Sequence, residues 1–370
     1  MKLSWLTGLR GLTALIVVFY HLSQSRNTVG LSEFSWDFYQ FSEHLVFVVS
    51  IFFIFSGFFR SLSYWKTWNR DIPVPKFFPS LRERFYRIAP VYYTALILSF
   101  IFVVYSYGWS IEWSLRLLAG FTFLSWISPE TFFPVDENGP LWFVSYDMIG
   151  WIGISLLMMY VIRLKKIWQI GCVFWVIGYV LVVFHFLYIS LPWIKVPGIA
   201  GEWFPTYNPF LFGLHFLIGA ILWGIIEWMK RIEYKKNLIF DIVGGASFIF
   251  LWYFLWSIRE AWDWEYSWPH WPYHFPFTTM GIIGLILSLP YSRYLGKLFD
   301  NIFLSFIAKV SYALYVFHVL VIVLLRKYIF TEVQLWFYNW SIFSISVLFF
   351  SFLIAWGVHR YIEDGGWFKK

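Results

Sequence analysis

Charged residues are scarce in this chain. Asp, Glu, Lys and Arg make up 13% of its 370 residues, whereas apolar residues make up 60% and aromatic residues 25%. Soluble domains contain about 25% charged and about 45–50% apolar residues, so too few polar side chains are present here to cover a soluble globule. The shortage of charge excludes a soluble protein and predicts a chain that crosses a membrane several times.

Cysteine is almost absent as well. The single Cys172 excludes an intramolecular disulfide, and its place in an apolar run makes it a packing residue. His270 and His274 are four residues apart, but Pro272 between them argues against a helical metal site. The sequence also lacks low-complexity tracts and repeats of about 20–50 residues. We therefore expect residues 1–370 to form one integral-membrane domain that binds no metal.

Apolar runs long enough to span a bilayer recur along the chain. A helical span needs about 20 mainly apolar residues. Ten such spans are predicted, at residues 8–26, 43–60, 86–107, 141–161, 167–189, 209–229, 238–258, 276–291, 308–325 and 336–358. The run at 114–127 is shorter and contains Arg116, so we expect a re-entrant or interfacial segment there. The predicted fold class is an all-α polytopic membrane protein with about ten transmembrane helices.

Lys and Arg are unevenly distributed between the predicted loops. With the N-terminus inside, only six of the 28 Lys and Arg residues fall in outer segments, and the other 22 fall in inner ones. This bias is typical of cytoplasmic loops, so both termini are predicted to be cytoplasmic, in a bacterial inner membrane or other plasma membrane. It also accounts for the net charge of +7 without a nucleic-acid partner.

The first predicted span, GLRGLTALIVVFYHLSQ, contains Arg10 and His21. They are eleven residues apart, so at about 100° per residue they share one helix face, roughly 16 Å apart along the axis. An ionisable side chain in a membrane is costly and needs a reason. Arg10 is either a snorkelling interface anchor or a functional cation. His21 is either a hydrogen-bonded packing residue or a proton-transfer group.

A basic cluster lies where an inner loop becomes a helix, in LRERFYRIAPVYY. Arg84 and Arg87 are three residues apart and share a helical face, and Arg82 and Lys76 lie nearby. Paired guanidinium groups suit a phosphate or pyrophosphate. The alternative is a positive-inside anchor or a lipid headgroup site.

Two further spans contain polar groups. ENGPLWFVSYDMIGW places Ser145 and Asp147 just inside the outer end of a span. The carboxylate should pair with a cation or face a wet cavity; it could orient His21 as in a dyad, or serve as a structural partner for a Trp or Tyr donor. SYALYVFHVLVI places His318 a third to halfway across another span, on one face with Tyr315. His318 is either a ligand or a packed, hydrogen-bonded residue, whereas His44, His185 and His215 either pack in that way or line the cavity.

An outer loop, EAWDWEYSWPHWPYHFPF, mixes carboxylates with aromatic rings. The rings could stack on sugars while Asp263 and Glu265 accept hydrogen bonds from hydroxyl groups. The alternative is an interfacial Trp and Tyr belt.

Taken together, these residues resemble the acyltransferase-3 family of integral-membrane acyltransferases. The matching features are Arg10 with ten residues before His21, IFFIFSGFF in the second span, Arg84-Phe-Tyr-Arg87 before IAPVYY, LWFVSYDM, SYALYVFH and the terminal HRYIED. They occur in family order from residue 8 to residue 364, so the resemblance covers almost the whole chain.

The resemblance implies transfer of an acyl group, often acetyl, from cytoplasmic acyl-coenzyme A to a hydroxyl of an extracytoplasmic acceptor. The acceptor would be a cell-surface polysaccharide or its lipid-linked precursor. In that reading His21 is the family's essential histidine, Arg10 is its paired arginine, and Arg84 and Arg87 form the motif thought to hold the coenzyme. Asp147 stands where many relatives have a glutamate, so the resemblance supports a role for Asp147 less strongly.

His318 and Glu363 also match recurring family positions, without a fixed role. The expected catalytic residues are therefore His21, Asp147 and His318, and the expected acyl-CoA ligands are Arg10, Arg84 and Arg87. The expected partners are acyl-CoA, a carbohydrate or glycolipid acceptor, and membrane lipids.

A proton-coupled exporter of a glycan or lipid is the main alternative, because buried His, Asp and Arg in many spans also suit transport. The sequence shows no internal symmetry of the kind that would favour it. A polysaccharide polymerase or lipid-linked glycosyltransferase would need larger outer loops rich in Arg and Asp. A non-enzymatic scaffold gives no reason for histidines in several spans.

Overall fold

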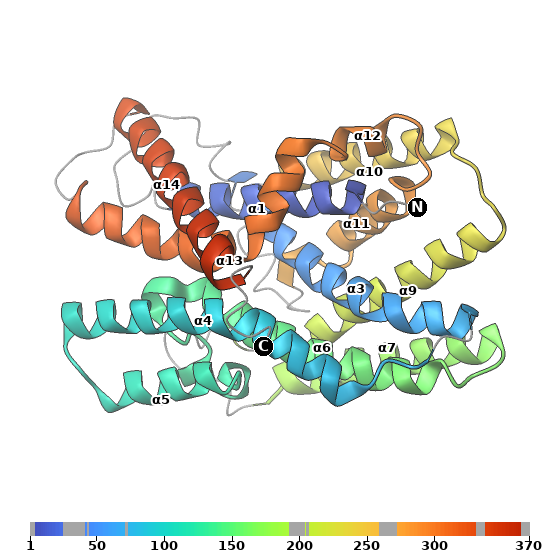
Figure 1. The fold of residues 1–370 in the computed structure, drawn as a ribbon, viewed down its shortest axis with the longest axis horizontal. Helices are drawn as coiled ribbons and strands as arrows, with labels where there is room; N and C mark the ends of the chain where they lie inside the picture. Colours follow the sequence, from blue (N-terminus) through green and yellow to red (C-terminus); the bar gives the residue numbers. More distant parts are fainter. Residues whose placement is uncertain are drawn as a thin grey trace.

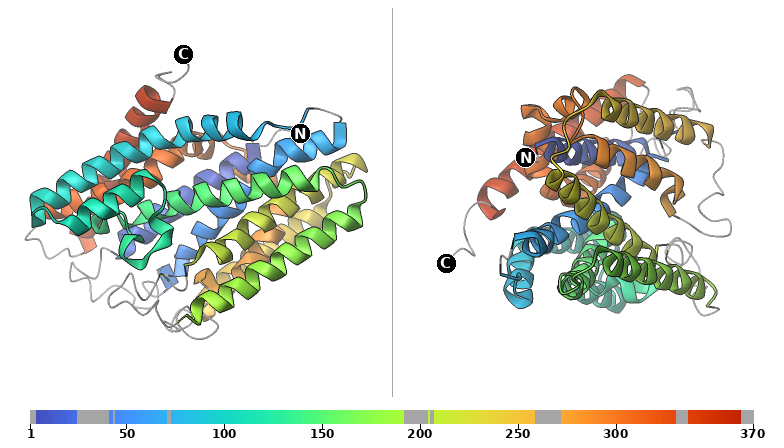
Figure 2. Two further views of the ribbon diagram at one scale, coloured as in Figure 1. Left: turned by 90° about the horizontal axis from the view of Figure 1, so that it is seen from below. Right: turned by 90° about the vertical axis from the view of Figure 1, so that its right-hand side faces the viewer.

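The computed structural model describes residues 4–24, 41–42, 44–70, 73–191, 204, 207–258, 272–330 and 337–363, and every regular element within these ranges is helical. Most of the long helices run close to the long axis of the molecule and pack side by side (Figures 1 and 2). They are α1 (Ser4–Gln24), α3 (Val48–Arg70), α4 (Phe77–Tyr107), α6 (Trp142–Val161), α7 (Ile167–Ile189), α9 (Pro209–Arg231), α10 (Leu238–Ser257), α13 (Ile302–Tyr328) and α14 (Phe337–Val358). The predicted all-α class is confirmed.

Nine helices in the described part of the chain are long and apolar enough to cross a bilayer. They correspond to nine of the ten predicted spans. The remaining span, predicted at 276–291, contains the shorter helix α11 (Phe277–Ser288), whose 12 residues extend about 18 Å. Pro276 precedes this helix and Pro290 follows it. Because proline lacks a backbone N–H and disrupts the interior of a helix, the two residues keep α11 short. The chain is a multi-pass integral membrane protein.

The helices differ in how far the protein itself buries them. In the apolar stretch of α13, 72% of the residues are buried, whereas the corresponding share is 17% in α7 and in α10. The large apolar side chains on α7 and α10 that remain exposed, such as Trp175 and Tyr253, suit contact with lipid. The interior is built chiefly from α1, α3, α4, α6, α9 and α13, and the polar side chains described below lie among these helices.

Helices α3 and α9 are held together by a reciprocal pair of glycines. A Cβ atom at Gly57 would lie 2.0 Å from the Phe216 carbonyl oxygen, and one at Gly219 would lie 2.0 Å from the Ile54 carbonyl oxygen. Each glycine therefore lets the backbone of the other helix approach closely, as small residues do in membrane helix interfaces. Phe53 packs against Phe216 across the same interface.

The segment predicted to be re-entrant, 114–127, folds back along α4 without crossing. Gly108, with a positive φ of 85°, ends α4. The next helix, α5 (Ile111–Phe121), is capped at its start by Ser110, whose side chain accepts a hydrogen bond from the Trp113 amide at 3.1 Å. The two helices lie antiparallel in Figure 1, and Tyr93 Oη donates to the Phe121 carbonyl at 2.6 Å. The prediction of a non-crossing segment is confirmed.

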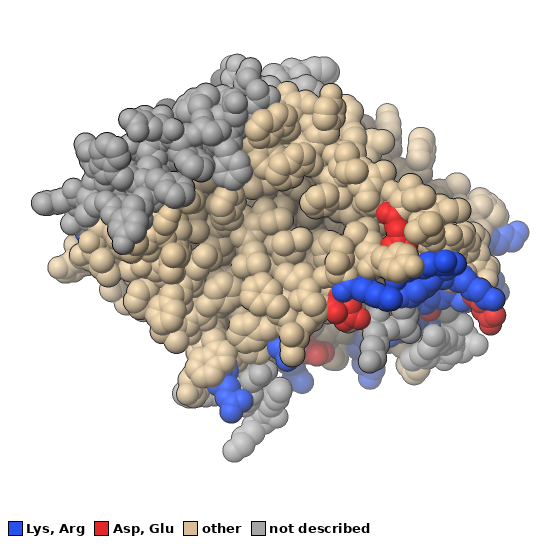
Figure 3. All heavy atoms as spheres, turned by 90° about the horizontal axis from the view of Figure 1, so that it is seen from above, with Lys and Arg blue, Asp and Glu red and all other residues tan. Residues whose placement is uncertain are grey.

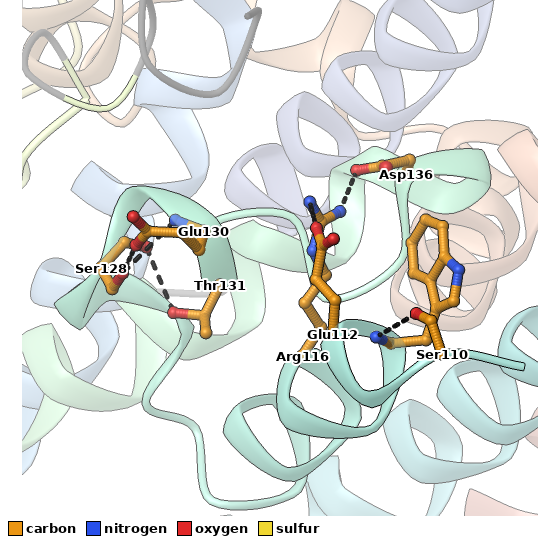
Figure 4. Close-up of polar contacts among 8 residues, drawn as sticks. Ser110, Glu112, Arg116, Ser128, Glu130, Thr131 and Asp136 are labelled. Atoms are coloured by element: carbon orange, nitrogen blue, oxygen red, sulfur yellow. Dashed lines mark hydrogen bonds and ion pairs between the residues drawn. The ribbon is translucent and has the colours of Figure 1, made fainter. Parts of the chain in front are cut away.

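Ion pairs hold this segment against the start of the next span. Arg116 bridges Glu112 and Asp136, each at 2.6 Å (Figure 4). Asp136 begins η4 (Asp136–Leu141), a short 3-10 segment that enters the bundle before α6 starts. Asn138 in η4 is fully buried and donates to the Val316 carbonyl at 3.0 Å, so η4 is anchored on α13.

One end of the bundle is rich in Lys and Arg, and we call it the basic end. It is the end at which α1, α4 and α13 begin and α3, α6 and α9 finish. On the face shown in Figure 3, Lys and Arg gather toward one side while most of the remaining surface carries no charge. The residues at this end include Lys66, Lys76, Arg163, Lys165, Lys166, Lys230, Arg231, Lys235, Lys236 and Lys297.

The glycine contact between α3 and α9 yields a stability prediction. Gly57→Ala and Gly219→Ala each place a methyl group against backbone, which we expect to destabilise the protein by about 1–3 kcal/mol, the usual cost of overpacking. Gly153→Ala on α6 is the matched control, because a Cβ atom there meets nothing within 4 Å. The melting temperatures of the three variants in detergent micelles test this: equal values for Gly57→Ala and Gly153→Ala would contradict the close contact.

Candidate functional site

Two parallel helices, α1 and α13, bring the two predicted site histidines together. Asn301 caps the start of α13 by accepting a hydrogen bond from the Leu304 amide at 2.8 Å. Gly8 and Gly11 of α1 lie directly against this region, since a Cβ atom at Gly11 would be 2.2 Å from the Leu304 carbonyl oxygen. With the two helix starts in register, His21 and His318 meet further along, their ring centroids 5.0 Å apart.

Each histidine has its Nδ1 atom engaged and its Nε2 atom available. Gln24 donates through Nε2 to Tyr20 Oη, so its Oε1 accepts the hydrogen bond from His21 Nδ1 at 2.9 Å. His318 Nδ1 faces the carbonyl oxygens of Leu314 at 3.1 Å and Tyr315 at 2.8 Å. Carbonyl oxygens only accept, so Nδ1 carries the proton in both rings and Nε2 presents a lone pair. Neutral imidazoles of this kind can accept a proton or attack a carbonyl.

The two histidines differ in access. His318 is fully buried, and its Nε2 atom has no hydrogen-bond partner within the protein. His21 is half-buried, and its Nε2 atom is not completely enclosed by the protein. His21 is therefore the histidine that a substrate can reach, with His318 behind it.

A buried ion pair joins α3, α4 and α6 on the basic-end side of the histidines. Arg84 Nη2 donates to Asp147 Oδ2, and Ser56 Oγ donates to the other carboxylate oxygen of Asp147 at 2.5 Å. The Asp147 carboxylate is therefore fully engaged by a cation and a hydroxyl. Of the roles considered for Asp147 from the sequence, the structure shows the pairing with a cation. The orienting hydrogen bond of the His21 ring goes to Gln24 instead.

Asp147 also lies deeper than its place at the start of a predicted span suggested. Residues 136–141 of η4 already run into the bundle before α6 begins, which adds to the depth of Asp147. Asp147 is close enough to Tyr315 to act on it electrostatically, and the Tyr315 ring lies 5.9 Å from the ring of His318. The ion pair and the histidine pair are thus neighbours.

Arg10, Arg87 and Glu363 belong to the electrostatic surroundings of the ion pair. Arg10 of α1 interacts electrostatically with Arg84, Arg87, Asp147 and Glu363. Arg87 is exposed on α4, one turn beyond Arg84. Glu363 ends the π-helical turn η8 (His359–Glu363), where its Oε2 atom lies 2.6 Å from His359 Nδ1. The three arginines predicted to bind a ligand lie on α1 and α4 within electrostatic range of one another, and we call them the arginine cluster.

Several polar atoms of this region lack a partner within the protein. Arg84 Nε, Glu363 Oε1 and His318 Nε2 are all buried without a hydrogen bond. A buried polar atom without a partner costs about 1–3 kcal/mol, so native structures rarely gather several in one place. Atoms of this kind also occur elsewhere among the described residues, Tyr146 Oη and His215 Nε2 among them, so they do not mark a ligand site by themselves. The arrangement offers cations for an anionic group on one side and imidazole lone pairs on the other.

Three members of the site were not singled out from the sequence. Gln24 orients His21, Ser56 holds Asp147, and Tyr312 donates to the Ile88 carbonyl at 3.0 Å while acting electrostatically on Arg84 and Asp147. Gln24 follows His21 by three residues, so helical spacing alone could have identified it. Nothing local marks Ser56, because its partner is 91 residues away.

The other polar side chains weighed from the sequence lie elsewhere or act structurally. Ser145 Oγ is buried beside Tyr92 without a well-formed hydrogen bond. His185 lies 2.7 Å from Asn208, and His215 lies 3.1 Å from the carbonyl oxygen of the preceding helical turn. Both are packing residues. Asp263, Glu265 and His270 of the aromatic loop lie outside the described residues.

His274 forms a buried pair with His44, the two rings joined by a 2.9 Å contact between His274 Nε2 and His44 Nδ1. Burial, together with the charge that His44 would carry, lowers the pKa of His274 to about 3. His274 therefore stays neutral at physiological pH, which fits a structural hydrogen bond between helix ends. Groups of three or more His, Cys, Asp or Glu that could hold a metal ion are absent from the described residues.

An apolar groove of about 570 Å³ runs along the opposite face of α4. Its walls include Phe78, Phe85, Phe123 and Trp126, with Arg82 as the charged residue. None of the predicted site residues lines it, so the groove is separate from the polar cluster.

Comparison with known proteins supports one family. The family model described as "Acyltransferase domain" matches residues 3–360. Two curated proteins of Staphylococcus aureus, from strains COL and MSSA476 and each named "Putative O-acetyltransferase", are 28% identical to this chain over 182 residues. The match covers 47% of this chain and 27% of each relative. No solved structure matches.

The matched family region includes the histidine pair, the ion pair and the arginine cluster, with only Glu363 beyond its end. Since it extends over almost the whole chain, the protein belongs to the acyltransferase-3 family of integral-membrane acyltransferases.

Proposed function

We propose that the protein is a membrane O-acyltransferase that moves an acyl group, most simply acetyl, from acyl-CoA to a hydroxyl of an acceptor. The observation that carries this proposal is the pair of imidazoles formed by the half-buried His21 and the buried His318, with both Nε2 lone pairs available beside the arginine cluster. Family membership supports the reaction class. The relatives' printed name supports oxygen as the acceptor atom.

The donor is proposed to enter from the basic end. Acyl-CoA carries phosphate groups, and the guanidinium groups of Arg10, Arg84 and Arg87 can each bind phosphate oxygens. The excess of Lys and Arg at this end supports a cytoplasmic location for it by the positive-inside rule, and acyl-CoA is a cytoplasmic metabolite. Both chain termini would then be cytoplasmic.

The acceptor is proposed to approach from the opposite end, toward the half-buried His21. In a bacterial inner membrane this direction favours a cell-surface polysaccharide or a lipid-linked glycan. His21 lies about 16 Å beyond Arg10 along α1, at ~1.5 Å per residue. The flexible arm that links the phosphates of acyl-CoA to its thioester would cover this distance.

In the proposed step, the acceptor hydroxyl transfers its proton to His21 Nε2 as its oxygen attacks the thioester carbonyl carbon. The new C–O bond forms and the C–S bond breaks, with its electron pair remaining on sulfur. The imidazolium proton then passes to the thiolate, which leaves as free coenzyme A. In a relay variant, Nε2 first takes the acyl group from the thioester and passes it to the hydroxyl.

Removing the reactive imidazole tests this role. His21→Gln keeps a polar side chain of similar size but no basic nitrogen, so we expect acetyl transfer to fall by about 10²–10⁴-fold, the usual contribution of a general base. His215→Gln is the matched control, because His215 is also a buried helical histidine but bonds only its own helix. Free thiol released from acetyl-CoA by the protein in lipid nanodiscs is the measurement; unchanged release by His21→Gln would rule out the proposed role.

The donor-binding role of the cluster is tested at Arg87. This residue is exposed, so Arg87→Gln removes a cation without leaving a buried carboxylate unpaired. We expect the dissociation constant for coenzyme A to rise roughly tenfold or more, as a lost charge-assisted hydrogen bond predicts. Arg82→Gln is the control, since Arg82 lines the apolar groove on the other face of α4. Equal affinities for the two variants in calorimetry would place the donor elsewhere.

A further inference from the structure

Arg60 is a buried cation without a carboxylate partner. It is 8% exposed, in the interface between α3 and α6. Its Nε atom donates to Ser155 Oγ and its Nη2 atom donates to Tyr64 Oη, both at 2.6 Å. Among the described residues Arg60 forms no ion pair, and Glu83, on the exposed side of α4, acts on it only electrostatically. Two neutral hydroxyl groups cannot neutralise a buried guanidinium, so its charge calls for an anion.

The guanidinium plane of Arg60 is fixed and partly unused. Its central carbon lies 4.0 Å above the Trp151 ring and 4.7 Å from the Tyr64 ring, which holds the plane in one orientation. Arginine has five N–H donors, and the two hydrogen bonds above occupy two of them. The Nη1 atom has no partner within the protein and is not sealed from solvent. Three donors therefore remain for a ligand, in the fork geometry that suits phosphate oxygens.

Arg60 is close to the proposed donor site but nearer the basic end. It follows Ser56 by four residues on α3, about one turn or ~6 Å along the axis. Its partners Trp151 and Ser155 follow Asp147 by four and eight residues on α6, which runs in the same direction. Arg60 also interacts electrostatically with Arg84. A ligand entering from the basic end would thus meet Arg60 before it reaches the Arg84–Asp147 pair.

We propose that Arg60 binds the 3′-phosphate of the donor's ribose, while Arg84 and Arg87 bind its pyrophosphate. This assignment rests on the proposed acyl-CoA-dependent activity. Coenzyme A has two separate phosphate groups, and the structure has two separate groups of arginine donors. The thioester arm is attached to the pyrophosphate and must point toward His21, so the nucleotide end must point toward the basic end. Arg60 occupies that position.

The proposal predicts how the protein distinguishes acetyl-CoA from 3′-dephospho-acetyl-CoA. With the wild type, we expect the KM for the dephosphorylated donor to be roughly tenfold higher, as loss of a charge-assisted hydrogen bond implies. In Arg60→Met the two KM values should become nearly equal, through a higher KM for acetyl-CoA, with kcat little changed. Arg231→Met is the matched control, since Arg231 also lies over a tryptophan ring at the basic end, 5.2 Å from Trp68; it should keep the wild-type preference.

Ser155→Ala provides a second test if Arg60→Met does not fold. It keeps the cation but removes the oxygen that orients Nε, so we expect it to lose part of the preference for the 3′-phosphate. A preference retained in full by either variant, or absent in the wild type, would overturn the role of Arg60 while leaving the proposed activity standing. If the wild type turns over neither donor, the proposed activity itself fails.

Discussion

A buried ion pair between Arg84 and Asp147 connects the parts of this protein that matter for chemistry. It joins α4 to α6, and the Ser56 hydroxyl extends the connection to α3. Separating such a pair inside the bundle leaves an uncompensated charge, which costs about 3–5 kcal/mol. The pair therefore fixes the depth at which the arginine cluster sits. It also leaves Arg84 Nε as a buried donor without a protein partner.

The position of the histidines depends on glycine contacts rather than on charge. Gly8 lets α1 approach Phe299, just before α13, and Gly11 lets it approach the start of α13 itself; the parallel course of α1 and α13 then brings His21 to His318. Gly57 and Gly219 do the same for α3 and α9, and α3 carries both Ser56 and Arg60. Close helix contacts at glycine thus help to set the positions of the polar groups that these helices carry.

Much of the fold was predictable because the length of an apolar run and the placement of Lys and Arg report directly on membrane crossing. The exception is α11, which is short because Pro276 lies at its start and Pro290 just beyond its end. The hydropathy averaged over an apolar run does not reveal such limits. Arg10, Arg84 and Arg87, which were predicted as ligands, lie within electrostatic range of one another. The partner of Asp147 could not be chosen from the sequence, since Arg84 is 63 residues away and η4 changes the depth of the carboxylate. Nothing local marks Arg60 either, because its partner Ser155 is 95 residues away.

The central claim is that one continuous site runs from the arginine cluster to the histidine pair. An electron cryo-microscopy structure with a non-hydrolysable analogue of acetyl-CoA, in which a methylene replaces the sulfur, tests it most directly. The account predicts the pyrophosphate on Arg84 and Arg87, with the analogue's carbonyl carbon about 3–3.5 Å from His21 Nε2, as a reactive geometry requires. An analogue bound with its carbonyl away from both histidines, or with its phosphates outside the arginine cluster, would contradict the account.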